Sequence, residues 1–136
     1  MPGIDESLLD AMRVPGARGA SVVDWVSGLA LGVVGEASSG DHEATAVETA
    51  EFARAALESR SFAPAGDDGR PERDPGVTPP VEDMIVTTAD SYHVLRFVST
   101  PFDSSVFLHL WLDRTAGNLA LARIRLAETA DRLVLG

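Results

Sequence analysis

Hydrophobic and polar residues near the start of the chain recur with a helical period. Leu8, Leu9 and Met12 fall on one face of a short predicted helix, which Asp5 can begin as its N-cap. Pro15 then ends this helix, because proline has no backbone N–H to continue the hydrogen-bond ladder. The pattern predicts one short amphipathic helix before residue 15.

The next apolar positions favour two strands joined by a tight turn. Residues 18–25 (RGASVVDW) form the first predicted strand and residues 29–34 (LALGVV) the second. Gly28 supplies the backbone freedom of the turn. Asp24 is interpreted as a side chain that hydrogen-bonds the backbone of that turn. A β-hairpin is thus predicted directly after the first helix.

From residue 41 the pattern changes to that of a long amphipathic helix, predicted over residues 42–59. Its small and apolar positions recur at spacings of four, three and four: Ala46, Ala50, Ala53 and Leu57. The charged positions lie opposite this stripe: Glu48, Glu51, Arg54 and Glu58. Because the stripe and the charges are separated, one face of the helix is predicted to be buried.

Residues 61–80 show neither a helical nor a strand period and hold five of the eight prolines, together with several acids. Such a composition is typical of a flexible loop. A structureless stretch of this length is unusual inside a compact domain. We therefore interpret residues 61–80 as a Pro- and acid-rich insertion into a single domain that spans residues 1–136.

The remaining pattern predicts a second hairpin, a third strand and a closing helix. Residues 81–88 and 92–98 flank a short polar turn, and residues 105–112 (SVFLHLWL) are apolar on both faces, which implies cover on both sides of a sheet. Thr115 or Asn118 can start the closing helix. The apolar positions that share a face of that helix are Leu119, Ala122, Leu126 and Leu133.

These elements occur in the order α-β-β-α-β-β-β-α, which predicts an α+β fold. A chain of 136 residues supports one domain with a real core. A net charge of −10 opposes attraction to phosphate, so no nucleic-acid partner is expected. No apolar run is long enough to insert in a membrane, the first residues are acidic rather than basic, and the chain has no cysteine. We therefore expect a cytoplasmic protein.

The candidate chemistry is sparse. His42, His93 and His109 lie in different predicted elements without metal-ligand spacing, so no metal site is expected. Ser21 lacks the surroundings of a nucleophile elbow, and the glycines form no phosphate-binding loop. Neither a catalytic residue nor a cofactor is predicted, and we expect the protein not to be an enzyme.

The alanine stripe of the long helix suits close packing against another backbone. Either the chain's own sheet covers it, or a second subunit does. The strand that contains Met84 and Val86 can in turn be a sheet edge open to pairing. The predicted dimer interface comprises Ala46, Ala50, Ala53, Leu57, Met84 and Val86. The charged residues opposite are predicted to contact a partner protein: Glu48, Glu51, Arg54 and Glu58.

Three segments together resemble the roadblock (dynein light chain-related) family. They are LLDAMRVPGARGASVVDWVSGLAL at the front, MIVTTADSYHVLRFV in the second hairpin and LWLDRTAGNLALARIRL at the end. The resemblance implies a five-stranded antiparallel sheet sandwiched by helices, with profilin-like layering, and dimerisation through the second helix and the following strand. The loop over residues 61–80 departs from the family pattern. All eleven basic residues are arginine, which suggests a high-GC source and an actinobacterial-type member.

By this resemblance the protein is expected to be a homodimeric adaptor that regulates a Ras-like small GTPase, in a system that in actinobacteria also includes a sensor kinase. Two alternatives remain open: a small-ligand sensor, and a general scaffold without selectivity for the nucleotide state. The few polar residues among the predicted core positions disfavour the sensor.

Overall fold

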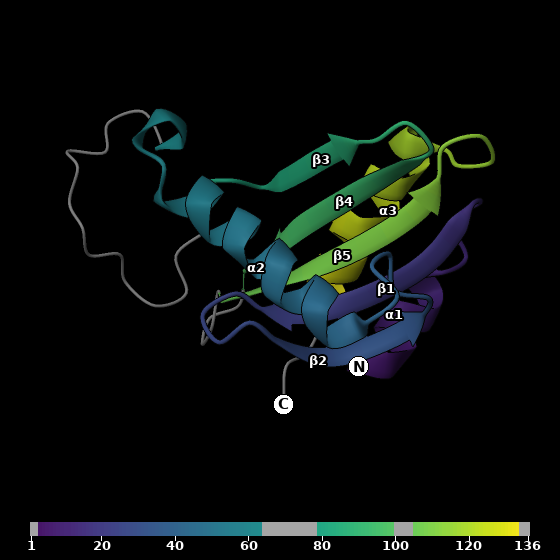
Figure 1. Ribbon diagram of the computed structural model, residues 1–136, viewed down its shortest axis with the longest axis horizontal. Coiled ribbons are helices and arrows are strands. Elements are labelled where there is room, and N and C mark those ends of the chain that lie inside the picture. The colour runs from purple at the N-terminus through teal and green to yellow at the C-terminus, as the bar shows by residue number, and fades with distance from the viewer. Residues whose placement is uncertain (1–2, 64–78, 100–104, 134–136) are drawn as a thin grey trace.

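A computed structural model describes residues 3–63, 79–99 and 105–133, and shows one antiparallel sheet with helices on both faces (Figure 1). The sheet has five strands in the order β2-β1-β5-β4-β3. Helices α1 and α3 lie behind the sheet in Figure 1, and α2 crosses its front. The predicted element order and fold class are confirmed.

Helix α1 (Ile4–Ala11) begins two residues earlier than its sequence suggests. Gly3 occupies the N-cap position, and no side chain caps the helix. Asp5, the predicted cap, lies in the first turn instead, where its charge favours the positive end of the helix dipole. Leu8 is fully buried, whereas Leu9 is exposed, so the predicted apolar face is wrong at that position.

Strands β1 (Ala17–Asp24) and β2 (Leu29–Gly35) form the predicted hairpin. Gly28 has a φ of +78°, a conformation that glycine adopts at no steric cost. Asp24 Oδ1 accepts hydrogen bonds from the backbone N–H groups of Val26 at 2.8 Å and Ser27 at 3.3 Å. The predicted role of Asp24 in ordering the turn is confirmed.

Helix α2 (His42–Glu58) has an N-cap that accounts for its sharp start. The carboxylate of Asp41 accepts from the backbone N–H of Glu43 at 2.9 Å and of Ala44 at 3.5 Å. A single turn of 3-10 helix, η1 (Arg60–Phe62), follows. Most of the predicted loop over residues 61–80 lies outside the described residues, which resume at residue 79.

Strands β3 (Asp83–Thr87), β4 (Ser91–Val98) and β5 (Val106–Asp113) complete the sheet within two residues of the predicted bounds. Strand β5 is central and almost wholly buried, as its apolar pattern predicts. Helix α3 (Leu119–Arg132) is capped by Asn118, whose Oδ1 accepts from the N–H of Leu121 at 3.0 Å. Of the two predicted starts, Asn118 is therefore correct.

The two faces of the sheet carry separate cores because successive side chains of a strand point to opposite sides. On the face of α1 and α3, apolar side chains of β1, β4 and β5 pack with Leu8, Ala122 and Leu126. On the face of α2, a smaller cluster surrounds Phe97 and Phe107, whose rings meet edge to face at 6.0 Å. The described helices include none long and apolar enough to cross a bilayer.

Candidate functional site

The alanine stripe of α2 faces the chain's own sheet. Ala46, Ala50 and Ala53 are 2% exposed or less, and they pack in one cluster with Leu95 and Phe107. A side chain that is fully covered within one subunit has no exposed surface with which to contact a second subunit. The prediction that these alanines contact a partner subunit is therefore wrong, and the intramolecular alternative is correct.

The other residues of the predicted dimer interface divide between core and surface. Leu57 and Met84 are partly buried and pack against the same cluster as the alanines. Val86 is exposed on β3, which is an edge strand of the sheet. Of the predicted set, Val86 alone thus presents a large exposed apolar side chain.

The two flanks of α2 have different neighbours. Val47 lies 3.7 Å from the point where a Cβ of Gly28 would stand, so this flank faces the β1–β2 turn. Thr45, on the other flank, lines a small cavity with His109 and Trp111. Phe52 is two helical turns beyond Thr45 and 63% exposed. The flank of α2 that is nearer β3 therefore carries an exposed aromatic ring.

The predicted partner-binding residues on α2 are not equivalent. Glu48, Glu51 and Glu58 are exposed, as expected of the face opposite the core. Arg54 is half-buried, and its Nη1 donates to the backbone carbonyl of Trp25 at 3.1 Å. Arg54 is thus held by the β1–β2 turn of its own chain, and its predicted contact with a partner stays a prediction. The contact of Glu48, Glu51 and Glu58 with a partner protein also stays a prediction.

Two histidines that are far apart in sequence meet on the face of α2. Nδ1 of His93 on β4 and Nε2 of His109 on β5 are 2.9 Å apart, so one nitrogen carries the proton and the other accepts it. Burial lowers the pKa of His109 to about 3, and the neighbouring His93 contributes to that shift. Burial also lowers the pKa of His93, although Asp90 opposes that shift. Both rings are therefore neutral at pH 7.

A buried serine extends this pair: Ser91 Oγ lies 3.4 Å from Nε2 of His93. Ser21 stands opposite His109 in the β1–β5 ladder, whereas Nε2 of His109 is bonded to His93. Within the described ranges, no three histidine, cysteine or acidic side chains come close enough to hold a metal ion. His42 lines the same small cavity as His109, and its Nε2 lies 3.0 Å from the carbonyl oxygen of Gly35.

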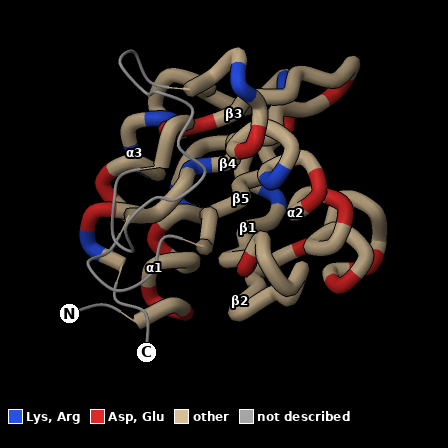
Figure 2. The backbone as a smooth tube through the Cα atoms, turned by 90° about the vertical axis from the view of Figure 1, so that its left-hand side faces the viewer, with Lys and Arg blue, Asp and Glu red and all other residues tan. Residues whose placement is uncertain are grey.

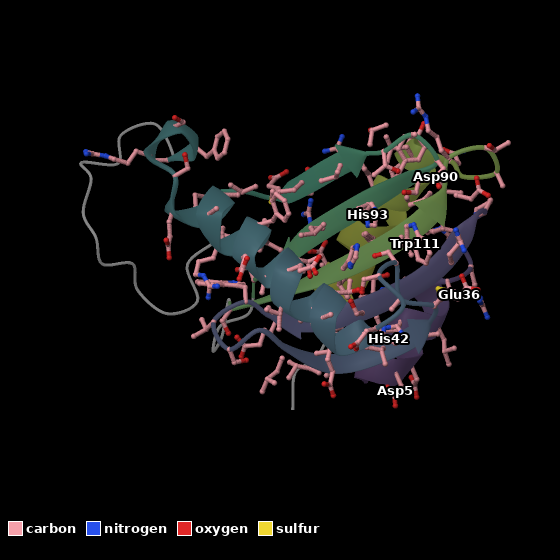
Figure 3. All side chains as sticks on the ribbon, viewed as in Figure 1. Asp5, Glu36, His42, Asp90, His93 and Trp111 are labelled. Carbon is pink, nitrogen blue, oxygen red and sulfur yellow. The ribbon has the colours of Figure 1, made fainter. Side chains whose placement is uncertain are left out.

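A row of side chains crosses the sheet on the face of α2, and Figure 3 labels two of its members, His93 and Trp111. Val86, His93 and Trp111 are direct neighbours on β3, β4 and β5, and the rings of His93 and Trp111 stack at 6.3 Å. The guanidinium of Arg18 lies 4.0 Å from the centre of the Trp111 ring and binds Glu36 at 2.9 Å. An aromatic row of this kind, flanked by a cation, is suited to contact with a protein. It offers no reactive group.

The sequence carries only a weak signal for this row, and its periodicity predicts no contact between the two histidines. His93 and His109 lie on strands that are adjacent in the sheet, and both side chains fall on the face of α2. Residues 100–104, which separate the two strands in the sequence, are outside the described residues. Residue type and spacing alone do not reveal such a cross-strand pair.

No protein-family model and no curated protein matches the sequence. Solved structures do match. MglB of Myxococcus xanthus is 20% identical with a TM-score of 0.66, covering 94% of this chain and 79% of that one. An MglB with a tetrameric arrangement is 18% identical, with a TM-score of 0.66 and coverage of 94% and 82%. A Roadblock/LC7 domain from Streptomyces avermitilis is 18% identical, with a TM-score of 0.63 and coverage of 96% and 93%. The fold is that of the roadblock/LC7 domain.

Proposed function

We propose that the protein is a non-enzymatic, cytoplasmic homodimer that binds a Ras-like small GTPase and biases its nucleotide state. The supporting observations are two exposed apolar side chains on a roadblock/LC7 fold, Phe52 of α2 and Val86 of the edge strand β3, which we call the apolar strip. The described side chains supply surfaces rather than reactive groups, which favours regulation by binding. The arginine-only basic composition fits an actinobacterial source, where a sensor kinase is a further partner of the system.

Edge strand β3 is the proposed centre of the dimer. Its outer backbone groups have no neighbouring strand in the sheet, so the same strand of a second copy can pair with it. A two-fold axis through that pair brings the two copies of Val86 and of Phe52 into one self-complementary surface. In this proposed dimer, α2 contacts the second copy through its flank nearer β3, which carries Phe52. The alanine stripe makes no contact with the second copy.

A rigid dimer can regulate a GTPase without chemistry of its own. A GTPase has two arrangements of its switch regions, and a surface that contacts one arrangement better shifts the population toward it. Glu48, Glu51 and Glu58 remain the proposed acidic contacts with the GTPase, because all three are exposed on α2.

The small-ligand alternative has less support from the cavities of the described residues. The cavity beside Thr45 and His109 has a volume of about 10 Å³, and one between α1 and α3 has about 60 Å³. These volumes accommodate one to a few water molecules rather than a metabolite. A scaffold without nucleotide selectivity remains the second candidate, and the binding experiment separates it from a regulator.

The decisive experiment measures the molecular mass of the protein in solution and its affinity for a small GTPase in each nucleotide state. Light scattering at micromolar concentration is expected to give the mass of a dimer. The small GTPase encoded nearest the gene, loaded with GDP or with a non-hydrolysable GTP analogue, is expected to bind in one state more tightly than in the other. Equal affinity in both states leaves a scaffold, and a monomer mass contradicts the proposed assembly.

The proposed interface at Phe52 and Val86 is tested by replacing these apolar residues with charged ones. Phe52→Arg combined with Val86→Lys is expected to give a folded monomer, because both side chains are exposed in the single chain and only the interface loses apolar contact. Ile124→Lys is the matched control, since Ile124 is an exposed apolar residue of α3. A double variant that keeps the dimer mass would place the interface elsewhere.

A further inference from the structure

Exposed apolar side chains gather at the opposite edge of the sheet from the proposed dimer. They lie on strand β2, in the turn before it and on the adjoining flank of α2, and are between 40% and 64% exposed: Val26, Leu29, Leu31, Val33 and Val47. We call this surface the β2-edge patch. Val47 joins the other residues because it contacts the turn at Gly28.

The backbone of β2 is an open sheet edge. β2 is the terminal strand and pairs only with β1, so its outer N–H and C=O groups face no strand of this sheet. Natural proteins usually block such an edge with lysine, proline or an inward-pointing charge. Leu29–Gly35 carries none of these. A bulge opposite the Val22/Val23 step adds twist and interrupts the alternation of side chains. Leu29 pairs with Asp24 on the face of α1, whereas Val33 pairs with Ser21 on the face of α2.

The rim of the β2-edge patch is acidic. Asp5 of α1 is exposed, and its Oδ1 lies 3.7 Å from the point where a Cβ of Gly32 would stand. Glu43 and Glu51 are exposed on α2, one turn before and one turn after Val47. Figure 2 shows acidic positions on α1 and α2 to either side of β2, which has none. The strand is thus an uncharged edge between borders that are mostly acidic, with Arg54 as a cation at the β1–β2 turn.

This charge pattern favours a basic partner over a second copy of the chain. A second copy of the chain would bring the same acids against these borders, and its net charge of −10 adds to the repulsion. An extended segment with arginine or lysine at its ends meets both borders with opposite charge. Alternate apolar side chains on that segment share one face, on which they can meet the exposed Val33 and Val47 on the α2 side of the sheet.

We propose that the β2-edge patch binds an extended, basic segment of another protein, which adds to the sheet as a sixth strand beside β2. The segment has apolar side chains at alternate positions and basic residues at its ends. Because β2 and β3 are opposite edges of the sheet, this site stays open when β3 pairs with a second copy. The proposal does not depend on dimerisation or on GTPase binding.

The test uses the full chain, labelled with ¹⁵N, and three short synthetic peptides. The first has valines at alternate positions and arginines at both ends; the second replaces the arginines with glutamates; the third is the first with N-methylated backbone amides. The arginine peptide is expected to shift the amide signals of residues 29–34, with an affinity that falls as salt is added. The glutamate and N-methylated peptides are expected to bind at least about tenfold more weakly.

A pair of exposed-site variants supplies the control. Leu31→Lys is expected to weaken the arginine peptide by about tenfold or more, through like charge and lost apolar contact, while Ile124→Lys leaves it unchanged. Leu31→Lys is also expected to keep the oligomeric mass of the wild type. Equal binding of the charged peptides, shifts away from β2, no binding at millimolar peptide, or an assembly that Leu31→Lys dissociates would each overturn the proposal.

Discussion

His109 makes the stability of the protein depend on pH. Its neutral ring is buried, with a pKa of about 3, whereas the unfolded chain binds a proton near pH 6.5. The unfolded state therefore binds more protons over this window, and stability falls as the pH decreases from about 6.5 toward 3. His93 adds a contribution of the same sign because its pKa is also lowered.

We expect the free energy of unfolding to drop by about 2 kcal/mol between pH 7 and pH 5, above most carboxyl titrations. Urea unfolding at both pH values measures it. His109→Gln is expected to show a smaller drop. An unchanged pH dependence in His109→Gln would show that this ring is not the group responsible.

Ala50 tests the corrected orientation of α2. Replacing it with leucine forces extra methylene groups against Leu95 and Phe107, so we expect a loss of about 1 to 3 kcal/mol in the free energy of unfolding. Ala55→Leu is the control on the same helix, because Ala55 is exposed, and it is expected to stay within about 0.5 kcal/mol. Thermal unfolding compares the two. Equal effects would mean that the helix is rotated from the orientation described.

At the scale of elements, two aspartates near the N-termini of helices differ in whether they cap the helix. Asp41 caps α2 through its carboxylate, whereas Asp5 lies inside the first turn of α1 and caps nothing. Asp41→Ala is expected to cost about 1 kcal/mol of stability, and Asp5→Ala only a few tenths from the lost dipole interaction. Denaturant midpoints measure the difference. A larger loss at Asp5 would favour the cap that the sequence suggested.

At the scale of the molecule, the net charge of −10 opposes association of two copies. The proposed dimer surface is apolar, so salt screens the repulsion without weakening the attraction. Raising the ionic strength from 0.01 to 0.15 M shortens the screening distance from about 30 to about 8 Å. We expect the dimer dissociation constant to fall over that range in sedimentation at serial dilutions. A rise would indicate an interface held by opposite charges.

The sequence by itself determined the order of the elements, most of their bounds, the glycine turn and the role of Asp24. These features depend on periodicity and on residues only a few positions apart, which local sequence records directly. It also determined that one face of α2 is buried, through the stripe of Ala46, Ala50 and Ala53.

Only the tertiary structure decided what covers that face, because an amphipathic stripe has the same pattern whether it meets its own sheet or another subunit. It likewise decided that His93 meets His109, that Arg54 binds the carbonyl of Trp25 and that β2 is an open edge. Each of these facts depends on strand order and register. Those are set by contacts between segments that are distant in sequence, where no local period carries the information.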